Sequence, residues 1–346
     1  MITFLPARPG RLADVPVFTR AIGGAESNVA CALAAAGHRV RWVSRVGADG
    51  FGDHLVAAVA GYGVDTGAVR RDPDRPTGVY FRTATDRADG AHEVLYYRAG
   101  SAASAMSPAT VGYDALLGAR VLHLSGITAA LSDGCLALLR DLTARRPGRP
   151  LLSFDVNHRP GLWRTPDGPG VLLELARGAD LVFVGEDEAE TAWGLRGPDA
   201  VRAALPEPAA LVVKRGAEGA TLFLRAPLGQ GAGSLTGSAR HRDSGAPAAD
   251  RRYAEPAPRV AVVAPVGAGD AFAAGFLSAT LRGLDPRARL RHGHLMAAAA
   301  LTVPGDLAAP PGRDRADRLA ALPGADWAAL RLAPGWTGND QEVPTS

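Results

Sequence analysis

Short apolar runs alternate with longer segments of helical periodicity through most of the chain. Continuous runs of Val, Ile and Leu are typical of buried strands, and apolar residues spaced three and four apart are typical of helices. The alternation predicts an α/β fold, a three-layer α/β/α sandwich with a mostly parallel central sheet. The clearest strands are expected at residues 40–44, 121–125, 151–155, 181–184, 211–214 and 260–263.

Polar residues stand at or soon after the ends of several expected strands. In open α/β sheets, ligands bind beyond the carboxyl ends of the strands. The residues expected to converge at this edge are Asp155, Asn157, Glu186, Lys214 and Asp270.

Some segments depart from this alternation. Residues 1–20 and 77–98 contain short strands, the latter around an Asp89-Gly90 turn, and predict a small β-sheet lid that closes over a substrate and excludes water. Residues 226–252 are rich in Gly, Ala, Ser and Arg, which predicts a flexible insertion. Residues 334–346 are expected to be a frayed tail, and residues 1–333 a single domain.

Composition narrows the class of protein. The chain has 346 residues, 47% of them apolar and 21% charged, as in ordinary soluble enzymes. The net charge is +3 and the basic residues are scattered, so we expect no nucleic-acid partner. No apolar run is long enough for a membrane span, and the N-terminus lacks signal-peptide features. Cys31 and Cys135 lie in apolar helical segments, which predicts buried free thiols and a cytoplasmic location.

Residues 264–272 read APVGAGDAF and join the expected strand 260–263 to a helix of small residues. Gly267, Ala268 and Gly269 should lie at the N-terminus of that helix, where unpaired N–H groups and the helix dipole attract anions and glycine allows a phosphate close to the backbone. Asp270 could act there as a general base or simply cap the helix. The residues alone leave both readings open.

Two motifs carry a family resemblance. Residues 23–28 (GGAESN) and 45–52 (RVGADGFG) resemble the N-terminal signature of the PfkB, or ribokinase-like, carbohydrate kinases, and residues 267–270 resemble the second signature of that family. They stand in the family's order, and the resemblance covers nearly the whole chain. It implies a ribokinase-like fold, ATP-dependent phosphorylation of a sugar hydroxyl, Mg²⁺ as cofactor, and a homodimer formed through the lids.

Three segments are similar to the 2-keto-3-deoxygluconate kinases of this family: residues 96–102 (YYRAGSA), 122–128 (LHLSGIT) and 155–163 (DVNHRPGLW). Arg98 and Arg159 present fork-shaped donors that suit the carboxylate of a sugar acid, whereas a neutral sugar does not need them. Either arginine could instead pair with a local acid such as Asp155. A fructokinase or other neutral-sugar kinase, or a catalytically silent sugar- or nucleotide-binding regulator, are the alternatives.

The resemblance also implies roles for individual residues. Asp270 would take the proton of the sugar hydroxyl, and the amides of Gly267, Ala268 and Gly269 would stabilise the transferring phosphate. The remaining residues expected to bind the sugar, its acid end included, are Gly24, Ala25, Asn28, Tyr80, Tyr96, Arg98 and Arg159. A plain turn at 23–24 and packing of the two tyrosines within the lid are the alternatives.

Nucleotide and metal residues follow from the same resemblance. Lys214 is the only lysine of the chain and ends an expected strand before Gly216 and Gly219, a segment that would border the nucleotide. His294 stands where an asparagine would often face the adenine. Glu188 matches the acid of an Asn-x-x-Glu motif that helps to organise magnesium. Lys214 could also be an ordinary strand-end residue, and Glu188 part of a solvated helix start.

Four features depart from the family pattern. The family's usual first strand, with its acidic residue, is not found before residues 23–24. A misplaced start site would explain its absence. Gly185 replaces the asparagine of Asn-x-x-Glu, and Ala264 replaces an aspartate linked to a monovalent cation site. His294 is the fourth, and Asp306 matches another acid at the site edge. The intact sequence at 267–270 favours an active kinase over a regulator.

Overall fold

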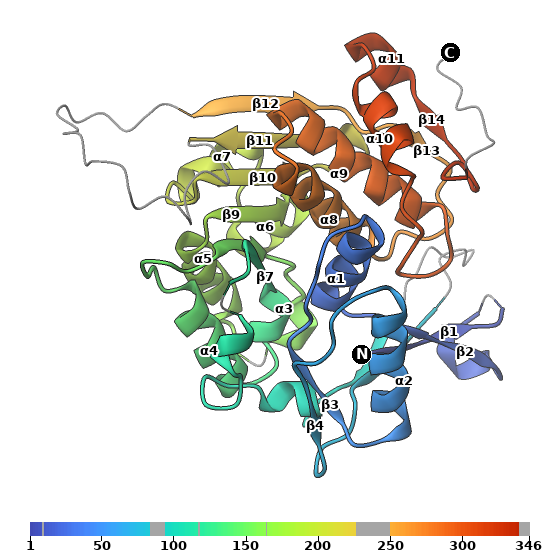
Figure 1. Ribbon diagram of the computed structural model, residues 1–346, viewed down its shortest axis with the longest axis vertical. Coiled ribbons are helices and arrows are strands. Elements are labelled where there is room, and N and C mark those ends of the chain that lie inside the picture. The colour runs from blue at the N-terminus through green and yellow to red at the C-terminus, as the bar shows by residue number, and fades with distance from the viewer. Residues whose placement is uncertain (9, 84–93, 117, 164, 226–249, 339–346) are drawn as a thin grey trace.

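The computed structural model describes residues 1–8, 10–83, 94–116, 118–163, 165–225 and 250–338 (Figure 1). Its main sheet has six strands in the order β12-β11-β10-β9-β8-β7. Strands β7 to β10 are parallel, and β11 and β12 run antiparallel to their neighbours. The strands are β7 (Val121–Ser125), β8 (Leu151–Asp155), β9 (Leu181–Gly185), β10 (Ala210–Lys214), β11 (Ala220–Leu224) and β12 (Arg251–Glu255).

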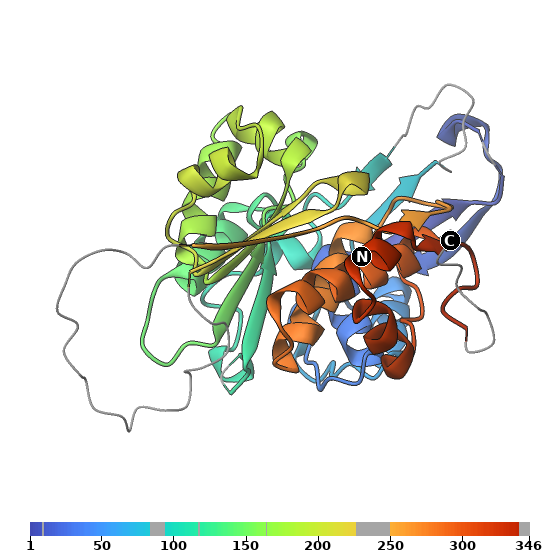
Figure 2. The same cartoon turned by 90° about the horizontal axis from the view of Figure 1, so that it is seen from above.

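Helices cover both faces of this sheet (Figure 2). One layer contains α1 (Ala25–Ala35), α8 (Ala268–Leu281) and α9 (Pro286–Leu301), and the other α4 (Asp133–Thr143), α5 (Gly168–Gly178), α6 (Glu186–Trp193) and α7 (Pro198–Ala204). Successive residues of the strands point to opposite layers: Phe183 and Val212 pack with α8, whereas Val182 and Leu211 pack with α5. Burial on both faces explains the continuous apolar runs. The predicted three-layer α/β/α fold is confirmed.

A second sheet of four strands, in the order β2-β1-β5-β6, projects from the main body (Figure 1). Its strands are β1 (Ile2–Pro6), β2 (Phe18–Ile22), β5 (Val79–Arg82) and β6 (Val94–Tyr97), and we call it the small sheet. Phe4 of β1 stacks on Phe81 of β5, with ring centroids 4.7 Å apart. The small sheet predicted from the two N-terminal segments is therefore present, while the expected turn at 89–90 lies outside the described residues.

The remaining elements connect these parts. The remaining α-helices are α2 (Gly50–Gly61), α3 (Gly126–Ala129), α10 (Arg313–Ala320) and α11 (Gly324–Ala329). The remaining strands form two pairs, β3 (Ser44–Gly47) with β4 (Val69–Asp72) and β13 (Arg259–Val260) with β14 (Arg331–Leu332). Asp49 of the 45–52 motif caps α2, because Oδ1 accepts from the Gly52 amide, and Oδ2 accepts from the Thr77 amide ahead of β5. The motif thus joins α2 to the small sheet.

Two of the expected strands are wrong. Of residues 40–44 only Ser44 lies in a strand, β3, which pairs with β4 and not with the main sheet. Of residues 260–263 only Val260 lies in a strand, β13, and Val262 and Val263 are 57% and 41% exposed. A β-branched run therefore crosses the surface here, because apolar character alone does not distinguish a buried strand from an exposed connection.

The structure also changes the bounds of the predicted insertion at 226–252 and of the predicted frayed tail at 334–346. Arg251 and Arg252, assigned to the flexible insertion, begin β12, and Asp250 before them pairs with Arg202; residues 226–249 of the insertion lie outside the described residues. Trp336, assigned to the frayed tail, is 2% exposed and packs with Trp327 and Leu332. Its indole anchors residues 334–338, because burial of so large an apolar side chain stabilises the segment. Cys31 and Cys135 are buried free thiols, as predicted.

Candidate active site

A cavity of about 1450 Å³ includes the edge where the carboxyl ends of the parallel strands meet the N-terminus of α8 and the small sheet, and it extends from there along β7 to Arg120 and along α8 to Leu281. Its position agrees with the rule that open α/β sheets bind ligands at this edge. Most of the predicted site residues line it: Gly24, Ala25, Asn28, Tyr80, Tyr96, Arg98, Arg159, Glu188, Lys214, Gly267, Gly269 and Asp270. Asp155 and Asn157 also line the cavity, whereas Glu186 is not among its lining residues.

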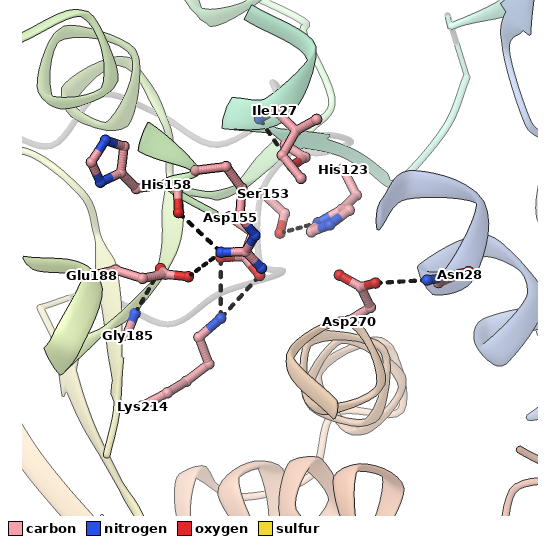
Figure 3. A network of polar contacts seen from close by, with 12 residues as sticks. Asn28, His123, Ile127, Ser153, Asp155, His158, Gly185, Glu188, Lys214 and Asp270 are labelled. Atoms are coloured by element: carbon pink, nitrogen blue, oxygen red, sulfur yellow. Dashed lines mark hydrogen bonds and ion pairs between the residues drawn. The ribbon is translucent and has the colours of Figure 1, made fainter. Parts of the chain in front are cut away.

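Asp270 lies in the first turn of α8 and faces this cavity (Figure 3). Its Oδ2 accepts a hydrogen bond from Asn28 Nδ2 of α1 at 2.8 Å. Burial raises the pKa of Asp270 to about 7, with Asp155 adding to the rise, while the bond from Asn28 and the charge of Lys214 oppose it. A carboxyl that titrates near neutral pH and is held by one amide is well placed to accept a proton.

The turn before α8 is shaped by Gly267. Its φ is +79°, and a Cβ built on it would lie 2.2 Å from the Asp306 carbonyl oxygen, so both the backbone conformation and the space require glycine. Among the described side chains none caps this N-terminus. The first amides of α8 therefore remain available to an anion, and the helix dipole favours negative charge there.

Lys214 ends β10, and its Nζ lies 3.1 Å from both oxygens of Asp155, at the end of β8. Burial alone would lower the pKa of Lys214, but Asp155, Glu188 and Asp270 outweigh it and raise the pKa. The ammonium thus stays charged beside the cavity. Figure 3 shows Lys214, Asp155 and Asp270 facing the same region from three different elements.

Glu188 in α6 has two partners within the described chain. Its Oε2 accepts from the Gly185 amide at 3.0 Å, and its Oε1 lies 3.4 Å from Arg159 Nη1. The acid that pairs with Arg159 is therefore Glu188 rather than Asp155, and Arg159 remains about half exposed. Gly185 fits because its missing side chain leaves room for the carboxylate of Asp187.

Oxygen donors suitable for a hard divalent ion face the same cavity. Glu188, Asp155 and Asn157 line it, and the buried Oδ1 of Asn157 has no hydrogen-bond partner. Within the described residues, no group of three or more His, Cys, Asp or Glu side chains lies close enough to hold a metal alone. These donors fit an ion such as Mg²⁺ that keeps several waters and takes other ligands from phosphate.

Arg98 follows β6, and its guanidinium lies 5.8 Å from the ring centroid of Tyr96. Burial lowers the pKa of Arg98, and Glu26 nearby partly opposes this shift. Its Nε has no hydrogen-bond partner, and Arg98 forms no ion pair within the described chain. The side chain thus offers unused donors to an anion in the cavity.

Three predicted nucleotide residues lie outside the lining of the cavity: Gly216, Gly219 and His294. His294 is buried on α9, where its Nε2 is 3.2 Å from the Glu255 carbonyl oxygen and its ring packs edge-on to Phe272. Burial lowers the pKa of His294 to about 4. A Cβ on Gly219 would lie 2.2 Å from the same Glu255 oxygen, so these residues meet at the end of β12. Ala268 also falls outside the lining.

Two groups at the site were not predicted from the sequence. Arg82 lies two positions beyond Tyr80 on β5 and therefore shares its face. The alternation of side chains along a strand could have predicted this from the sequence. Both side chains bond the Asp306 carboxylate. Thr128 of α3 donates its hydroxyl to Glu26 of α1, across a long separation in the sequence that no local pattern reveals.

Comparisons with known proteins agree with this architecture. The model of the pfkB family of carbohydrate kinases matches residues 1–311. A 2-dehydro-3-deoxygluconokinase of Thermoproteus tenax is 34% identical over 90% of this chain and 89% of its own length. One of Bacillus subtilis (strain 168) is 34% identical over 91% of both chains, and fructokinase-1 of Oryza sativa subsp. japonica is 31% identical over 80% of this chain and 79% of its own length.

Solved structures show the same fold. A PfkB protein from Polaromonas sp. JS666 superposes with a TM-score of 0.74 at 34% identity, covering 92% of this chain and 96% of its own. A sugar kinase from Pyrococcus horikoshii, determined in complex with ATP, gives a TM-score of 0.74 at 24% identity, with 91% of this chain and 94% of its own covered. Among the described helices, none combines the length and the apolar character needed to cross a bilayer.

Proposed function

Because the chain belongs to the pfkB family of carbohydrate kinases, we propose that it transfers a phosphoryl group from ATP to the terminal hydroxyl of 2-keto-3-deoxygluconate or a closely similar sugar acid. Two relatives at 34% identity carry the name of that activity. The observation that carries the proposal is the guanidinium of Arg98, which has no ion pair in the described chain and lines the same cavity as Asp270. A neutral sugar supplies no charge to match it.

Asp270 acts as the general base. A sugar hydroxyl is a weak nucleophile, and a carboxylate within hydrogen-bond reach takes its proton as the bond to phosphorus forms. Asn28 fixes the orientation of Asp270 through the bond to Oδ2, so Oδ1 remains free to face the hydroxyl. The raised pKa makes Asp270 a stronger base than an ordinary exposed aspartate, once it is deprotonated.

The N-terminus of α8 and Lys214 hold the transferring group. The amides at Gly267, Ala268 and Gly269 present fixed donors, which stabilise charge on the phosphate oxygens without reorganising. Lys214 adds a compact positive charge: a Cβ built on Gly269 would lie 3.5 Å from its Nζ. A bound Mg²⁺, held by Glu188, Asp155 and Asn157 directly or through water, would neutralise negative charge on the phosphates.

The acid end of the substrate lies at the small sheet. Arg98 would hold the carboxylate, with Tyr96 beneath its guanidinium and Tyr80 beside Tyr96, the ring centroids 5.7 Å apart. Arg159, which lines the same cavity, would join it after exchanging its long contact with Glu188 for the substrate. At 3.4 Å and half exposed, that contact is weak and easily replaced.

Release of ADP by the purified protein, measured with 2-keto-3-deoxygluconate, fructose and ribose, tests the proposal. We expect turnover of the sugar acid with kcat/KM at least a hundredfold above either neutral sugar. Arg98→Met should raise KM for the acid, whereas Arg196→Met, an exposed arginine on the surface, should not. Turnover of fructose or ribose alone would make the protein a neutral-sugar kinase, and ligand binding without any turnover would make it a regulator.

The remaining proposals concern assembly, place and the nucleotide. A homodimer formed through the small sheet is supported by the exposed side chains of Leu95 and Tyr97 on β6, which alternate with the cavity-facing Tyr96. A cytoplasmic location is supported by the two cysteines, which are free thiols. For the nucleotide, Gly216, Gly219 and His294 remain proposed contacts or supports; Gly219 and His294 meet Glu255 at the end of β12, which β11 separates from the strand that carries Lys214.

A further inference from the structure

Glu26 is an acid of the cavity that has no role in the phosphoryl transfer described above. It lies in the first turn of α1 and lines the cavity together with Thr128 of α3. Thr128 is 8% exposed, and its hydroxyl donates to Glu26 Oε1. No other side chain or amide of the described residues donates to the carboxylate, so Oε2 is left to a ligand.

The backbone that carries Thr128 is held tightly against the main body. A Cβ built on Gly126, at the start of α3, would lie 2.2 Å from the Val156 carbonyl oxygen and 2.4 Å from Leu172 Cδ2. Helix α3 therefore has no room to move toward the sheet, and Thr128 donates from a fixed position. Its hydrogen bond sets the direction in which the Glu26 carboxylate faces the cavity.

Charge limits what Glu26 can bind. Glu26 opposes the lowering of the pKa of Arg98 by burial more than any other charged group does, so the two side chains interact across the cavity, although no ion pair joins them within the described chain. The amino group of Met1, the other positive charge nearby, donates to the Gly23 carbonyl at 2.7 Å. A substrate carboxylate is attracted to Arg98 and repelled by Glu26. Glu26 therefore faces an uncharged part of the substrate, and the uncharged group that suits a carboxylate is a hydroxyl donor.

The two ends of the substrate are already held by other residues. Arg98 would hold its carboxylate, and Asp270, which Asn28 of α1 orients, would face its terminal hydroxyl. What remains for Glu26 is a hydroxyl on the carbon chain between these ends. In 2-keto-3-deoxygluconate such hydroxyls stand on C4 and C5.

We infer that Glu26, oriented by Thr128, determines specificity by accepting a hydrogen bond from a hydroxyl between the two ends of the sugar acid. The inference rests on the proposed function, which supplies the two ends. A hydrogen bond to a charged acceptor is stronger than one between neutral groups. A substrate without the hydroxyl would leave the carboxylate unpartnered in a closed site, so a 2-keto acid whose only hydroxyl is the terminal one should be a poor substrate.

The test compares kcat/KM for 2-keto-3-deoxygluconate with that for 6-hydroxy-2-oxohexanoate, which keeps the carboxylate and the terminal hydroxyl but lacks the hydroxyls between them. We expect the unaltered protein to prefer the first acid by about a hundredfold or more. Glu26→Ala should reduce this preference by about 10- to 100-fold, the range expected for a hydrogen bond to a charged group. Thr128→Val should reduce it by a smaller factor, because the carboxylate keeps its charge but loses its orientation. The matched control is Glu174→Ala, an exposed acid on α5 outside the cavity, which should leave the preference unchanged.

Glu26→Gln keeps the size of the side chain and an oxygen that accepts from Thr128, so it serves if Glu26→Ala does not fold. It should also lower the preference, because a neutral acceptor forms a weaker hydrogen bond. A folded variant of Glu26 that lowers kcat/KM for both acids by the same factor would overturn the inference, since Glu26 would then act only through Arg98, which both acids need. Unchanged kinetics would overturn it too.

The unaltered protein separates this inference from the proposed function. Similar kcat/KM for the two acids refutes the inference alone. No turnover of any sugar acid refutes the proposed function as well.

Discussion

Replacing Asp270 by Asn should stabilise the folded protein at alkaline pH and nearly abolish turnover. The substitution keeps the size of the side chain but removes the charge that burial disfavours. In the folded state the pKa of Asp270 is raised from 3.8 to about 7, so the native protein binds a proton that the unfolded chain releases. The contribution of Asp270 to the free energy of unfolding is therefore fully present below pH 3.8, and it is lost as the pH rises toward 7.

The size of the effect follows from that shift. A rise of about three pKa units corresponds to at most about 4 kcal/mol above pH 7, and because Asp270 keeps part of its surface in the cavity, we expect about 1 to 2 kcal/mol. Below about pH 4 the difference between the two proteins should vanish, since Asp270 is protonated in both states there. Loss of the base should lower kcat by about 10² to 10⁴.

Urea unfolding of both proteins at pH 5 and pH 8, together with kcat at each pH, measures these effects. The stabilisation by Asp270→Asn should be larger at pH 8 than at pH 5, and Asp53→Asn, an exposed acid on α2, should show neither effect. In the unaltered protein, kcat/KM should rise about tenfold between pH 6 and pH 8, as the deprotonated fraction of Asp270 rises from about 0.09 to about 0.91. Equal stability at both pH values with kcat preserved would refute the reasoning.

Three further predictions test single contacts. Gly267→Ala should raise KM for ATP at least tenfold and lower Tm, because the residue has a positive φ and its Cβ would lie 2.2 Å from a backbone oxygen. The control Gly283→Ala has φ +74° and open space around its Cβ, so it should lower the free energy of unfolding by about 1 kcal/mol and leave KM for ATP unchanged. Lys214→Met should destabilise the fold by about 3 kcal/mol, because it leaves the buried Asp155 carboxylate without its ion-pair partner. Adding Asp155→Asn should restore stability but not the affinity for ATP. Recovery of both would show that Lys214 does not bind the nucleotide. Tyr97→Asp should convert a dimer to monomers in light scattering, and a persistent dimer would place the interface elsewhere.

The four parallel strands of the main sheet were predicted from the sequence because their apolar runs are largely buried, whereas β11, which is fully buried, and β12 were not expected. The strands at 121–125 and 151–155 have the bounds that their apolar runs indicated. The same signal failed at 260–263, since Val262 and Val263 are equally apolar but exposed. The spacing of apolar residues predicts which elements they form, but it does not show whether other parts of the protein cover them.

The site was predictable where local motifs place residues at helix or strand ends. Asn28 and Asp270 are 242 positions apart in the chain but meet because each lies in the first turn of a helix beside the same cavity. Pairings that depend on three-dimensional packing escaped: Arg159 pairs with Glu188, and Asp306 pairs with Arg82. His294 lies on α9, most of whose residues are buried, so helical periodicity could not reveal which of its faces borders a ligand.

The most direct test of the central claim is a crystal structure with 2-keto-3-deoxygluconate bound. We predict that its carboxylate contacts the guanidinium of Arg98 and that its terminal hydroxyl lies within hydrogen-bond distance of Asp270. A sugar acid bound with its carboxylate away from Arg98, or with no hydroxyl near Asp270, would contradict the account.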